Sequence, residues 1–399
     1  MASSEVLYDP LLPEFHANPY PFYSRLREED PVHASPLGMW ILTRYDDAIM
    51  VLRDPRFGRA GMAERLEARL GMVPDPARTP DMLFSDPPDH TRLRALVSRA
   101  FTPRVVEAMR AHIQEIVDAL LDRVRHAHRM DLIEDLAYPL PVTVICEMLG
   151  VPTADRDVFK QWSSDIARSL DAAVLPADSE AIPRGRDARI ALGEYLSSLI
   201  ATRRKHPQAD LLSALIAAEE EGNKLTEREL LSTCILLLVA GHETTVNLIG
   251  NGVLALFQHP DQMRALREDP ALIQTAVEEL LRFDGPVQRT GRLATTDVEI
   301  GGRQIPKGST VVAVIGAANR DPAHFAEPDR LNIARRENRH IAFGFGIHFC
   351  LGAPLARVEG QIAIGILIRR MPDLALVSQT PKWRESSLLR GLKTLPVTF

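Results

Sequence analysis

The chain has 399 residues, of which 45% are hydrophobic and 25% charged, and its net charge is −6. This composition excludes extensive disorder, and the acidic balance argues against nucleic acid or an anionic membrane as a partner. Three cysteines exclude a disulfide framework and indicate a reducing compartment, so we expect a cytoplasmic protein. The N-terminus lacks a signal-peptide pattern, and the most apolar run, residues 234–241, is far shorter than the ~20 residues of a transmembrane helix. We therefore expect no membrane anchor.

The first predicted elements are a helix over residues 20–29, a strand over 39–43 and a helix over 45–53. Residues 59–85 contain several prolines and predict a long loop with a helical piece. Beyond this loop, apolar residues recur at i, i+3 and i+4 and predict helices over residues 89–101, 103–129, 139–150, 153–170 and 182–206, the first of them capped by Asp89.

The longest predicted helix covers residues 226–258, where Thr226 and Glu229 form a capping box and His259-Pro260 ends the helix. A helix over 270–282 precedes an alternating β region over 292–314, and a helix over 353–370 precedes a strand-like tail. The sequence therefore predicts a mainly α protein with a minor β region (α+β). We expect one domain over residues 1–399, with small β regions near 30–60 and 291–315 and at the C-terminus.

Residues 343–352 (FGFGIHFCLG) carry the sharpest chemical signal. Their glycines permit a close backbone approach to a flat ligand. Cys350 precedes a predicted helix N-terminus, whose N–H groups and dipole stabilise a thiolate, a good ligand for haem iron. The alternative is a buried cysteine that acts as a small hydrophobe, our interpretation of Cys146 and Cys234. The spacing of Phe343, Gly346, Cys350 and Gly352 favours the ligand.

With this motif the chain resembles the cytochrome P-450 family of haem-thiolate monooxygenases, in its soluble bacterial form, over almost all its length. The resemblance implies haem b (iron protoporphyrin IX) between the long helix, the family's I helix, and the Cys-ligand loop with its following L helix. It makes Cys350 the axial ligand of the haem iron. It also implies that Phe343 shields the sulfur and that Gly346 leaves room for the porphyrin.

Three further motifs fit this resemblance. Glu279 and Arg282 match the family's E-x-x-R pair, which either Arg330 or Arg335 completes; a surface i, i+3 ion pair is the alternative. His90 and Arg94, one turn apart on a helix, are implied to bind the haem propionates. By resemblance Arg292 and His348 join them, although each alone would be read as a solvated surface cation.

Residues 240–245 (AGHETT) resemble the family's oxygen-binding segment. A mid-helix glycine, here Gly241 beside Ala240, costs roughly 1 kcal/mol and calls for a reason, and we expect it to make room for O2. Thr244 can bond the i−4 carbonyl, and the resemblance assigns oxygen activation to Thr244 and proton transfer to Glu243. The alternative is a tolerated polar patch, and we interpret His242 as structural.

The resemblance implies a monomer that inserts one oxygen atom from O2 into a lipophilic substrate of the macrolide, terpenoid, steroid or fatty-acid class. Hydroxylation or epoxidation would use electrons from a separate ferredoxin and ferredoxin reductase, since we expect no fused reductase. Alternatives on the same fold are a peroxygenase that uses H2O2 and a non-catalytic haem-thiolate sensor or carrier. For the partner we expect a basic docking face with Arg99, Arg104, Arg110 and Arg357.

Apolar residues in the segments that would line the substrate site are Leu83, Val239, Ala240, Val287 and Leu389. In the same segments Arg289 and Arg390 are the charged residues that could meet a charged substrate.

Overall fold

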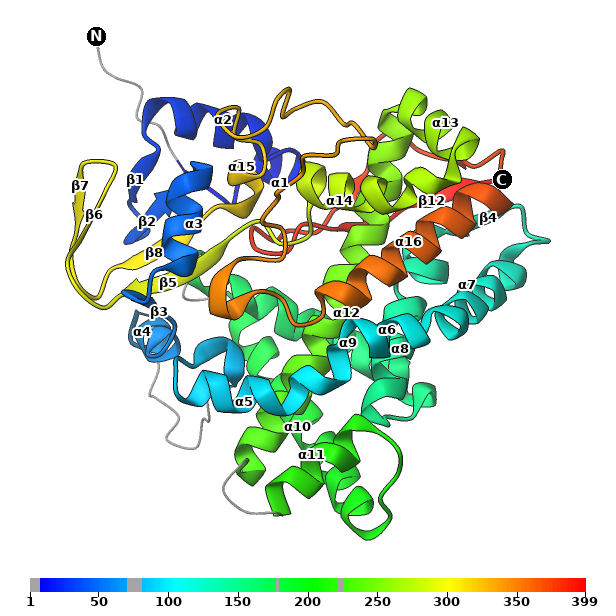
Figure 1. Ribbon diagram of the computed structural model, residues 1–399, viewed down its shortest axis with the longest axis horizontal. Coiled ribbons are helices and arrows are strands. Elements are labelled where there is room, and N and C mark those ends of the chain that lie inside the picture. The colour runs from blue at the N-terminus through cyan, green and yellow to red at the C-terminus, as the bar shows by residue number, and fades with distance from the viewer. Residues whose placement is uncertain (1–7, 70–80, 177–178, 221–224) are drawn as a thin grey trace.

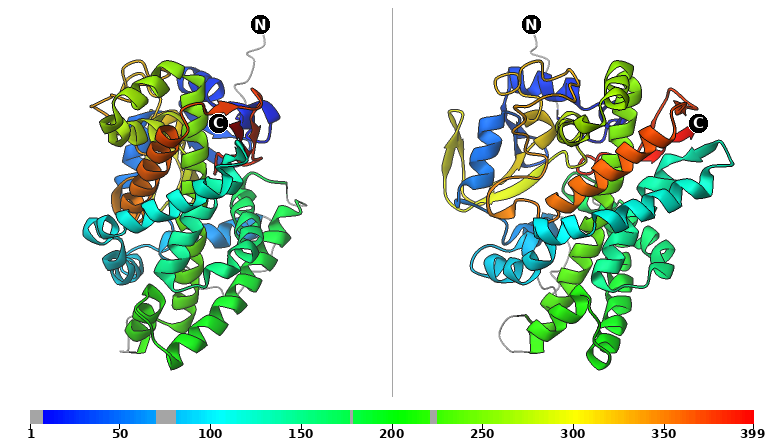
Figure 2. Two further views of the ribbon diagram at one scale, coloured as in Figure 1. Left: turned by 90° about the vertical axis from the view of Figure 1, so that its right-hand side faces the viewer. Right: turned by 45° about the vertical axis from the view of Figure 1, so that its right-hand side comes forward.

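Helices account for most of the computed structural model, which describes residues 8–69, 81–176, 179–220 and 225–399. The longest, α12 (Glu227–Gln258), runs through the middle of the molecule (Figure 1, Figure 2). The remaining α-helices are α1 (Pro13–Ala17), α2 (Tyr20–Glu29), α3 (Tyr45–Arg53), α4 (Met62–Arg69), α5 (Asp89–Ser98), α6 (Pro103–Ala108), α7 (Arg110–Val124), α8 (Pro139–Leu149), α9 (Arg156–Ser169), α10 (Ala181–Lys205), α11 (Leu211–Glu220), α13 (Pro260–Glu268), α14 (Ile273–Asp284), α15 (Ile315–Ala318) and α16 (Ala353–Arg370).

Short strands form a five-stranded sheet and three smaller ones. The larger sheet has the order β1-β2-β8-β5-β3, in which only β2 and β8 are parallel. The strands are β1 (Val32–Ser35), β2 (Met39–Leu42), β3 (Phe57–Gly58), β4 (Arg129–Asp131), β5 (Thr290–Ala294), β6 (Val298–Ile300), β7 (Arg303–Ile305), β8 (Thr310–Ala313), β9 (Ala375–Leu376), β10 (Lys382–Trp383), β11 (Leu392–Thr394) and β12 (Pro396–Thr398). The predicted β regions are therefore present, and the tail pairs as β4-β12-β9 and β10-β11.

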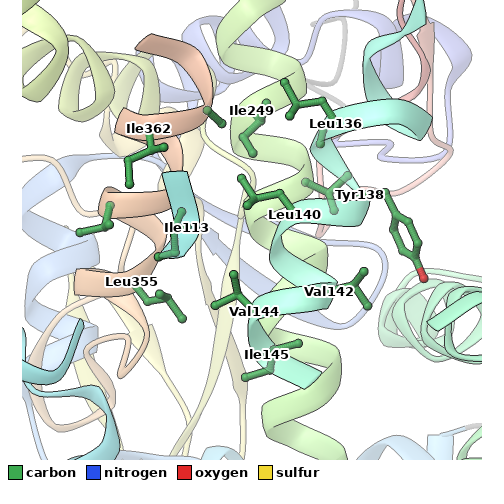
Figure 3. Close-up of a cluster of buried hydrophobic side chains, with 14 of the residues drawn as sticks. Ile113, Leu136, Tyr138, Leu140, Val142, Val144, Ile145, Ile249, Leu355 and Ile362 are labelled. Carbon is green, nitrogen blue, oxygen red and sulfur yellow. The ribbon is translucent and has the colours of Figure 1, made fainter. Parts of the chain in front are cut away.

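The main hydrophobic core lies between α12 and the helices that cross it. Helices α8 and α16 both pack on α12, and α16 also packs on α7. Figure 3 shows Leu140 and Val144 of α8 directed toward the side of Ile113 and Leu355, while Tyr138 points the opposite way. Because these helices are anchored through buried aliphatic side chains, α12 and the start of α16 are held in a fixed relation to each other.

Several predicted elements agree closely with the structure and others do not. The capping box of Thr226 and Glu229 is present at the start of α12, and α2, α3 and α16 have the predicted bounds. Asp89 is not an N-cap: Pro88 occupies that position, and the Asp89 carboxylate accepts a hydrogen bond from Arg92 at 3.0 Å. Part of the predicted loop over 59–85, residues 70–80, lies outside the described residues.

The prediction over residues 103–129 was wrong in detail, because α6, α7 and β4 divide this segment. Helices α11 and α13 were not predicted. The signal for α13 was present, since proline is favoured in the first turn of a helix, but Pro260 was interpreted only as the end of α12. Among the described residues, α12 is the one helix long and apolar enough to cross a membrane, and 78% of its most apolar window is buried in the protein.

Candidate functional site

A cavity of about 2160 Å³ lies between α12 and the Cys loop, which we define as residues 343–352. Its walls also include residues of α5, α10, β5 and the turn near Leu389. Pockets that bind one drug-sized ligand are typically about 300–1,000 Å³. The space is therefore large enough for a large flat cofactor together with a substrate.

Cys350 faces this cavity, whereas the other two cysteines, Cys146 and Cys234, are buried. Burial raises the pKa of the Cys350 thiol, and the backbone N–H groups of Gly352 and Ala353 act in the opposite direction through hydrogen bonds to the sulfur. These N–H groups belong to the start of α16, so the helix N-terminus stabilises negative charge on the sulfur as the sequence predicted. The local arrangement suits a thiolate ligand.

Five basic side chains line the cavity beside the Cys loop. Four of them, His90, Arg94, Arg292 and His348, were predicted; the fifth, Arg59, was not. Arg94 also holds the loop itself, because its Nη2 donates to the carbonyl oxygen of Phe349 at 2.7 Å. The four predicted residues come from α5, β5 and the Cys loop, so the structure brings together positions that are far apart in the sequence.

This basic cluster has few anionic partners of its own. The Asp86 carboxylate accepts the backbone N–H groups of Arg59 and Ala60 at 2.9 and 3.0 Å. The buried Nε of Arg59, Nδ1 of His90 and Nε2 of His348 have no hydrogen-bond partner among the described residues. Buried polar atoms are normally hydrogen-bonded. These unpartnered donors therefore indicate a ligand that carries acceptor oxygens.

The pKa values of the basic cluster also indicate an anionic ligand. Burial, reinforced by Arg59, lowers the pKa of Arg292 to about 8. Burial lowers the pKa of Arg59 to about 10 and, with the surrounding cations, that of His348 to about 2. Positive charge is thus held here at a free-energy cost. A ligand with two carboxylates, such as haem with its propionates, would remove that cost.

Helix α12 presents its predicted oxygen-binding segment to the cavity. Ala240 and Thr244 line it one turn apart, and the Thr244 hydroxyl donates to the Ala240 carbonyl at 3.2 Å. Gly241 also lines the cavity, and the structure gives a second reason for glycine at this position. A Cβ at this position would lie 2.7 Å from Cγ1 of Ile145 on α8, so the glycine is required by the packing of α8 against α12.

Glu243 also lines the cavity, but its carboxylate is engaged. Its Oε2 accepts a hydrogen bond from Nη1 of Arg384 at 2.7 Å, and the glutamate side chain is 4% exposed against 28% for the arginine. His242 is buried, with Nδ1 2.7 Å from the Leu238 carbonyl and Nε2 3.0 Å from the Ser163 hydroxyl. It is structural, as expected from the sequence.

Glu359 on α16 is a second acid at the cavity, and the sequence did not single it out. Neither carboxyl oxygen has a hydrogen-bond partner of normal geometry among the described residues. Burial raises the pKa of Glu359 to about 8, against the opposing effect of the Thr245 hydroxyl. A protonated carboxylic acid therefore lies next to α12 at neutral pH. Its position in the middle of α16, a helix that is buried on most sides, gave no signal.

Glu279, Arg282 and Arg335 form a network of hydrogen bonds, called the Glu279 network here, that fixes the segment leading to the Cys loop. Nε and Nη2 of Arg282 donate to Glu279 at 2.8 Å each. The sequence left two candidates for the third member, and the structure selects Arg335, whose Nε lies 3.1 and 3.2 Å from the two carboxylate oxygens. The Arg330 side chain instead pairs with Glu327 at 3.2 Å. The buried pair thus has the additional hydrogen bonds that make such a pair tolerable.

Two predicted residues have contacts that the sequence did not indicate. Gly346 does not line the cavity; its φ of +72° favours glycine, and a Cβ there would lie 2.5 Å from the Leu52 carbonyl oxygen. Arg357 is bound to Glu278 at 2.7 and 2.8 Å and stacks 4.5 Å from the ring centroid of Phe343. It is therefore committed within the protein and is not a free member of a docking face.

All five residues predicted for the substrate walls do line the cavity: Leu83, Val239, Ala240, Val287 and Leu389. Val287 and Leu389 form an isolated antiparallel bridge, so two of these walls are joined through their backbones.

A sequence model of the family described as cytochrome P450 matches residues 32–389. The chain belongs to the cytochrome P450 family. This P450 is 47% identical to cytochrome P450 107B1 of Saccharopolyspora erythraea over 391 residues, which cover 94% of the chain and 93% of the relative. It is also 47% identical to the vitamin D(3) 25-hydroxylase of Pseudonocardia autotrophica over 395 residues, with coverage of 96% and 94%.

A solved structure gives the same result for the fold. The myxobacterial cytochrome P450 CYP267B1, solved in complex with myristic acid, matches with a TM-score of 0.91 and 44% identity over 98% of both chains. The predicted P450 fold is therefore confirmed. The family makes this P450 a haem-thiolate oxidoreductase of the monooxygenase class, and Cys350 with its neighbouring cations is the part of the chain that fits such a cofactor.

Proposed function

We propose that this P450 inserts one oxygen atom from O2 into a C–H or C=C bond of a large lipophilic substrate, with haem b as its cofactor. The observation that carries the proposal is the convergence of Cys350, the basic cluster and Thr244 on one cavity. When bound, haem supplies the activation of O2. The chain's own residues hold the cofactor, exclude water and deliver protons.

Two groups of residues would hold the cofactor. The Cys350 sulfur, whose charge is supported by the start of α16, would ligate the iron. Arg59, His90, Arg94, Arg292 and His348 would donate to the two propionates, because all five side chains offer N–H donors and the three arginines also carry positive charge. Phe343 beside the sulfur would limit the access of water.

Proton delivery is the second task of the chain. The Thr244 hydroxyl, which donates to the Ala240 carbonyl in this structure and lines the cavity, would hold a proton for the oxygen that is reduced there. Glu243 would carry protons to it, and its ion pair with the partly exposed Arg384 offers a connection toward solvent. Glu359, with a pKa of about 8, would keep a second proton near α12 at neutral pH.

The cavity walls support a lipophilic substrate of the macrolide, terpenoid, steroid or fatty-acid class. Leu83, Val239, Val287 and Leu389 are apolar and together offer little to a polar molecule. The relative named as a vitamin D(3) hydroxylase and the solved relative with myristic acid agree with a ligand of this size and polarity.

Electrons would come from a separate ferredoxin and its reductase. Arg99 and Arg104 are exposed, and Phe345 and Ile347 on the Cys loop are 39% and 52% exposed. Exposed cations and exposed apolar side chains of this kind suit a weak, transient acidic partner. Such a complex should weaken as ionic strength rises.

The test is reconstitution of the haem-loaded protein with a ferredoxin, its reductase and a library of lipophiles. Compounds that shift the spin state of the haem are incubated with isotopically labelled O2, and products are analysed by mass spectrometry. We expect a product that has gained one labelled oxygen atom. Turnover with H2O2 but none with O2 and electrons would identify a peroxygenase, and binding without turnover under either condition would identify a carrier.

A further inference from the structure

A single charged side chain interrupts the apolar wall formed by Val287 and Leu389. Arg289 lines the cavity between these walls, although it is only 5% exposed. Its Nη2 donates to Oδ1 of Asp171 at 3.0 Å, and its Nε donates to the Ser387 hydroxyl at 3.1 Å. The remaining nitrogen, Nη1, has no hydrogen-bond partner among the described residues.

The Asp171 carboxylate is saturated, so it cannot turn to satisfy the third nitrogen. Its Oδ1 also accepts from the Ser387 hydroxyl at 2.7 Å, and Oδ2 accepts from the Ser386 hydroxyl at 2.5 Å and the Ser387 N–H at 3.2 Å. Arg168 is a further cation 3.9 Å from Oδ2, but its side chain is 33% exposed. The guanidinium of Arg289 is therefore held in one orientation by groups from two separate segments.

The position of Nη1 at the cavity indicates what this donor can bind. Because Arg289 lines the cavity and Nη1 has no protein partner among the described residues, this N–H group can donate to an acceptor on a ligand that fills the cavity. Since Asp171 neutralises Arg289, the pair offers a directed N–H group without net charge. Such a group favours a neutral oxygen acceptor over an anion. An anion loses more hydration free energy on entering the cavity, and a neutral pair compensates for less of that loss.

We propose that Nη1 of Arg289 donates a hydrogen bond to an uncharged oxygen of the substrate, such as an ester, lactone or ketone oxygen. Arg289 thereby selects lipophiles that carry this acceptor at a fixed distance from the carbon that is oxidised. The inference rests on the proposed function, because it names the substrate class of the same cavity.

Arg390 provides a matched comparison, because it too is buried and was flagged by the sequence. All three of its nitrogens are used: Nε donates to Asp284 at 2.6 Å, Nη1 to the His16 carbonyl at 2.7 Å and Nη2 to the Ala17 carbonyl at 3.1 Å. It is not part of the cavity wall. A conservative change at Arg390 therefore tests the effect of disturbing a buried arginine without touching the ligand.

The experiment measures binding of three probes to the haem-loaded protein by calorimetry: methyl decanoate, dodecane and decanoate. The proteins are the wild type, R289K, R390K and the double variant D171N/R289Q, which keeps a neutral hydrogen-bonded pair in place of the ion pair. We expect the affinity for methyl decanoate to fall about tenfold in D171N/R289Q and severalfold in R289K. The affinity for dodecane should change less than twofold, and R390K should leave both unchanged.

Equal losses for methyl decanoate and dodecane in D171N/R289Q would mean that the variant deforms the wall, and unchanged affinity for the ester would mean that Arg289 contacts no acceptor. Either result overturns the inference. A loss confined to decanoate would also overturn it, in favour of an anion site. Because calorimetry is independent of turnover, this inference can fail while oxygen insertion is observed, and oxygen insertion can fail while acceptor binding is observed.

Discussion

Oε2 of Glu243 accepts a hydrogen bond from Nη1 of Arg384 at 2.7 Å, so the acid on the cavity side of α12 is paired with a cation from the C-terminal region. The carboxylate is buried and the arginine reaches partly to the surface. Because the Arg384 guanidinium stays charged and cannot itself relay a proton, its part is to hold the Glu243 carboxylate between the cavity and the surface. In the proposed proton delivery, the group that carries the proton is therefore the Glu243 carboxylate.

Replacing Glu243 with Gln keeps the shape of the side chain but removes its ability to carry a proton. Product formation in the reconstituted system should fall by roughly 100-fold, the usual contribution of a positioned acid–base group. Haem content and substrate affinity should be unchanged, while a larger share of the consumed electrons yields peroxide. The measurement is the ratio of product formed to electrons consumed.

Arg384→Lys is the matched control for this change, since it preserves a cation beside Glu243. It should retain product formation within about threefold, because the ion pair survives with one donor fewer. If Glu243→Gln produced hydroxylated product as fast as the wild type, the proton route would have to run elsewhere.

The buried acid Glu359 should make stability depend on pH. Burial raises its pKa from 4.5 to about 8, so the folded protein holds a proton that the unfolded chain releases above pH 4.5. The free energy of unfolding therefore falls as pH rises through this window, by on the order of 1 kcal/mol per pH unit. Glu359→Gln should remove this dependence and be the more stable protein at pH 8. Parallel unfolding curves of the two proteins between pH 5 and pH 8 would contradict the assignment.

Arg59 should oppose the stability of the haem-free protein and favour cofactor binding. Burial disfavours the charged form of Arg59 in the folded state and lowers its pKa to about 10. Below that pH the side chain is charged, so the full free-energy cost of burying the charge is present. Arg59→Gln should raise the melting temperature of the haem-free protein and lower haem affinity about tenfold or more. Arg99→Gln, at an exposed position, is the control and should change neither quantity. A loss of stability in haem-free Arg59→Gln would show that the cluster is not under electrostatic strain.

The choice of Arg335 over Arg330 can be tested by comparing two alanine variants. Arg335→Ala removes one partner of a buried carboxylate and should cost about 3–5 kcal/mol of unfolding free energy. Arg330→Ala removes an exposed ion pair and should cost less than about 1 kcal/mol. Denaturant unfolding of both proteins gives the comparison, and equal losses would mean that the Glu279 network does not depend on Arg335.

The sequence predicted best those features that are local in the chain. The Cys loop, the Glu279–Arg282 pair and the capping box of α12 depend on residues within one turn or one loop, where spacing fixes geometry. Most of the basic cluster was found through its motifs. The apolar cavity walls were also predicted, because the resemblance to a known family supplied the fold.

The sequence could not supply contacts that depend on distant segments. Arg384 lies in the C-terminal region and reaches Glu243 only through the fold. Arg59 precedes a proline-rich segment that gave no indication of its burial. Glu359 occupies an ordinary helical position, and only the packing of α16 on α12 explains its raised pKa. Gly241 and Gly346 were recognised, but the atoms that require glycine, on Ile145 and Leu52, were not predictable.

The central claim is that the sulfur of Cys350 binds the haem iron, and the spectrum of the reduced protein with carbon monoxide tests it most directly. The wild type should show the strongly red-shifted Soret band of a thiolate-ligated haem. Cys350→Ala should lose that band. Cys146→Ala, the control at a buried cysteine, should keep it. A wild-type protein that takes up haem without this band, or a band that persists in Cys350→Ala, would contradict the account.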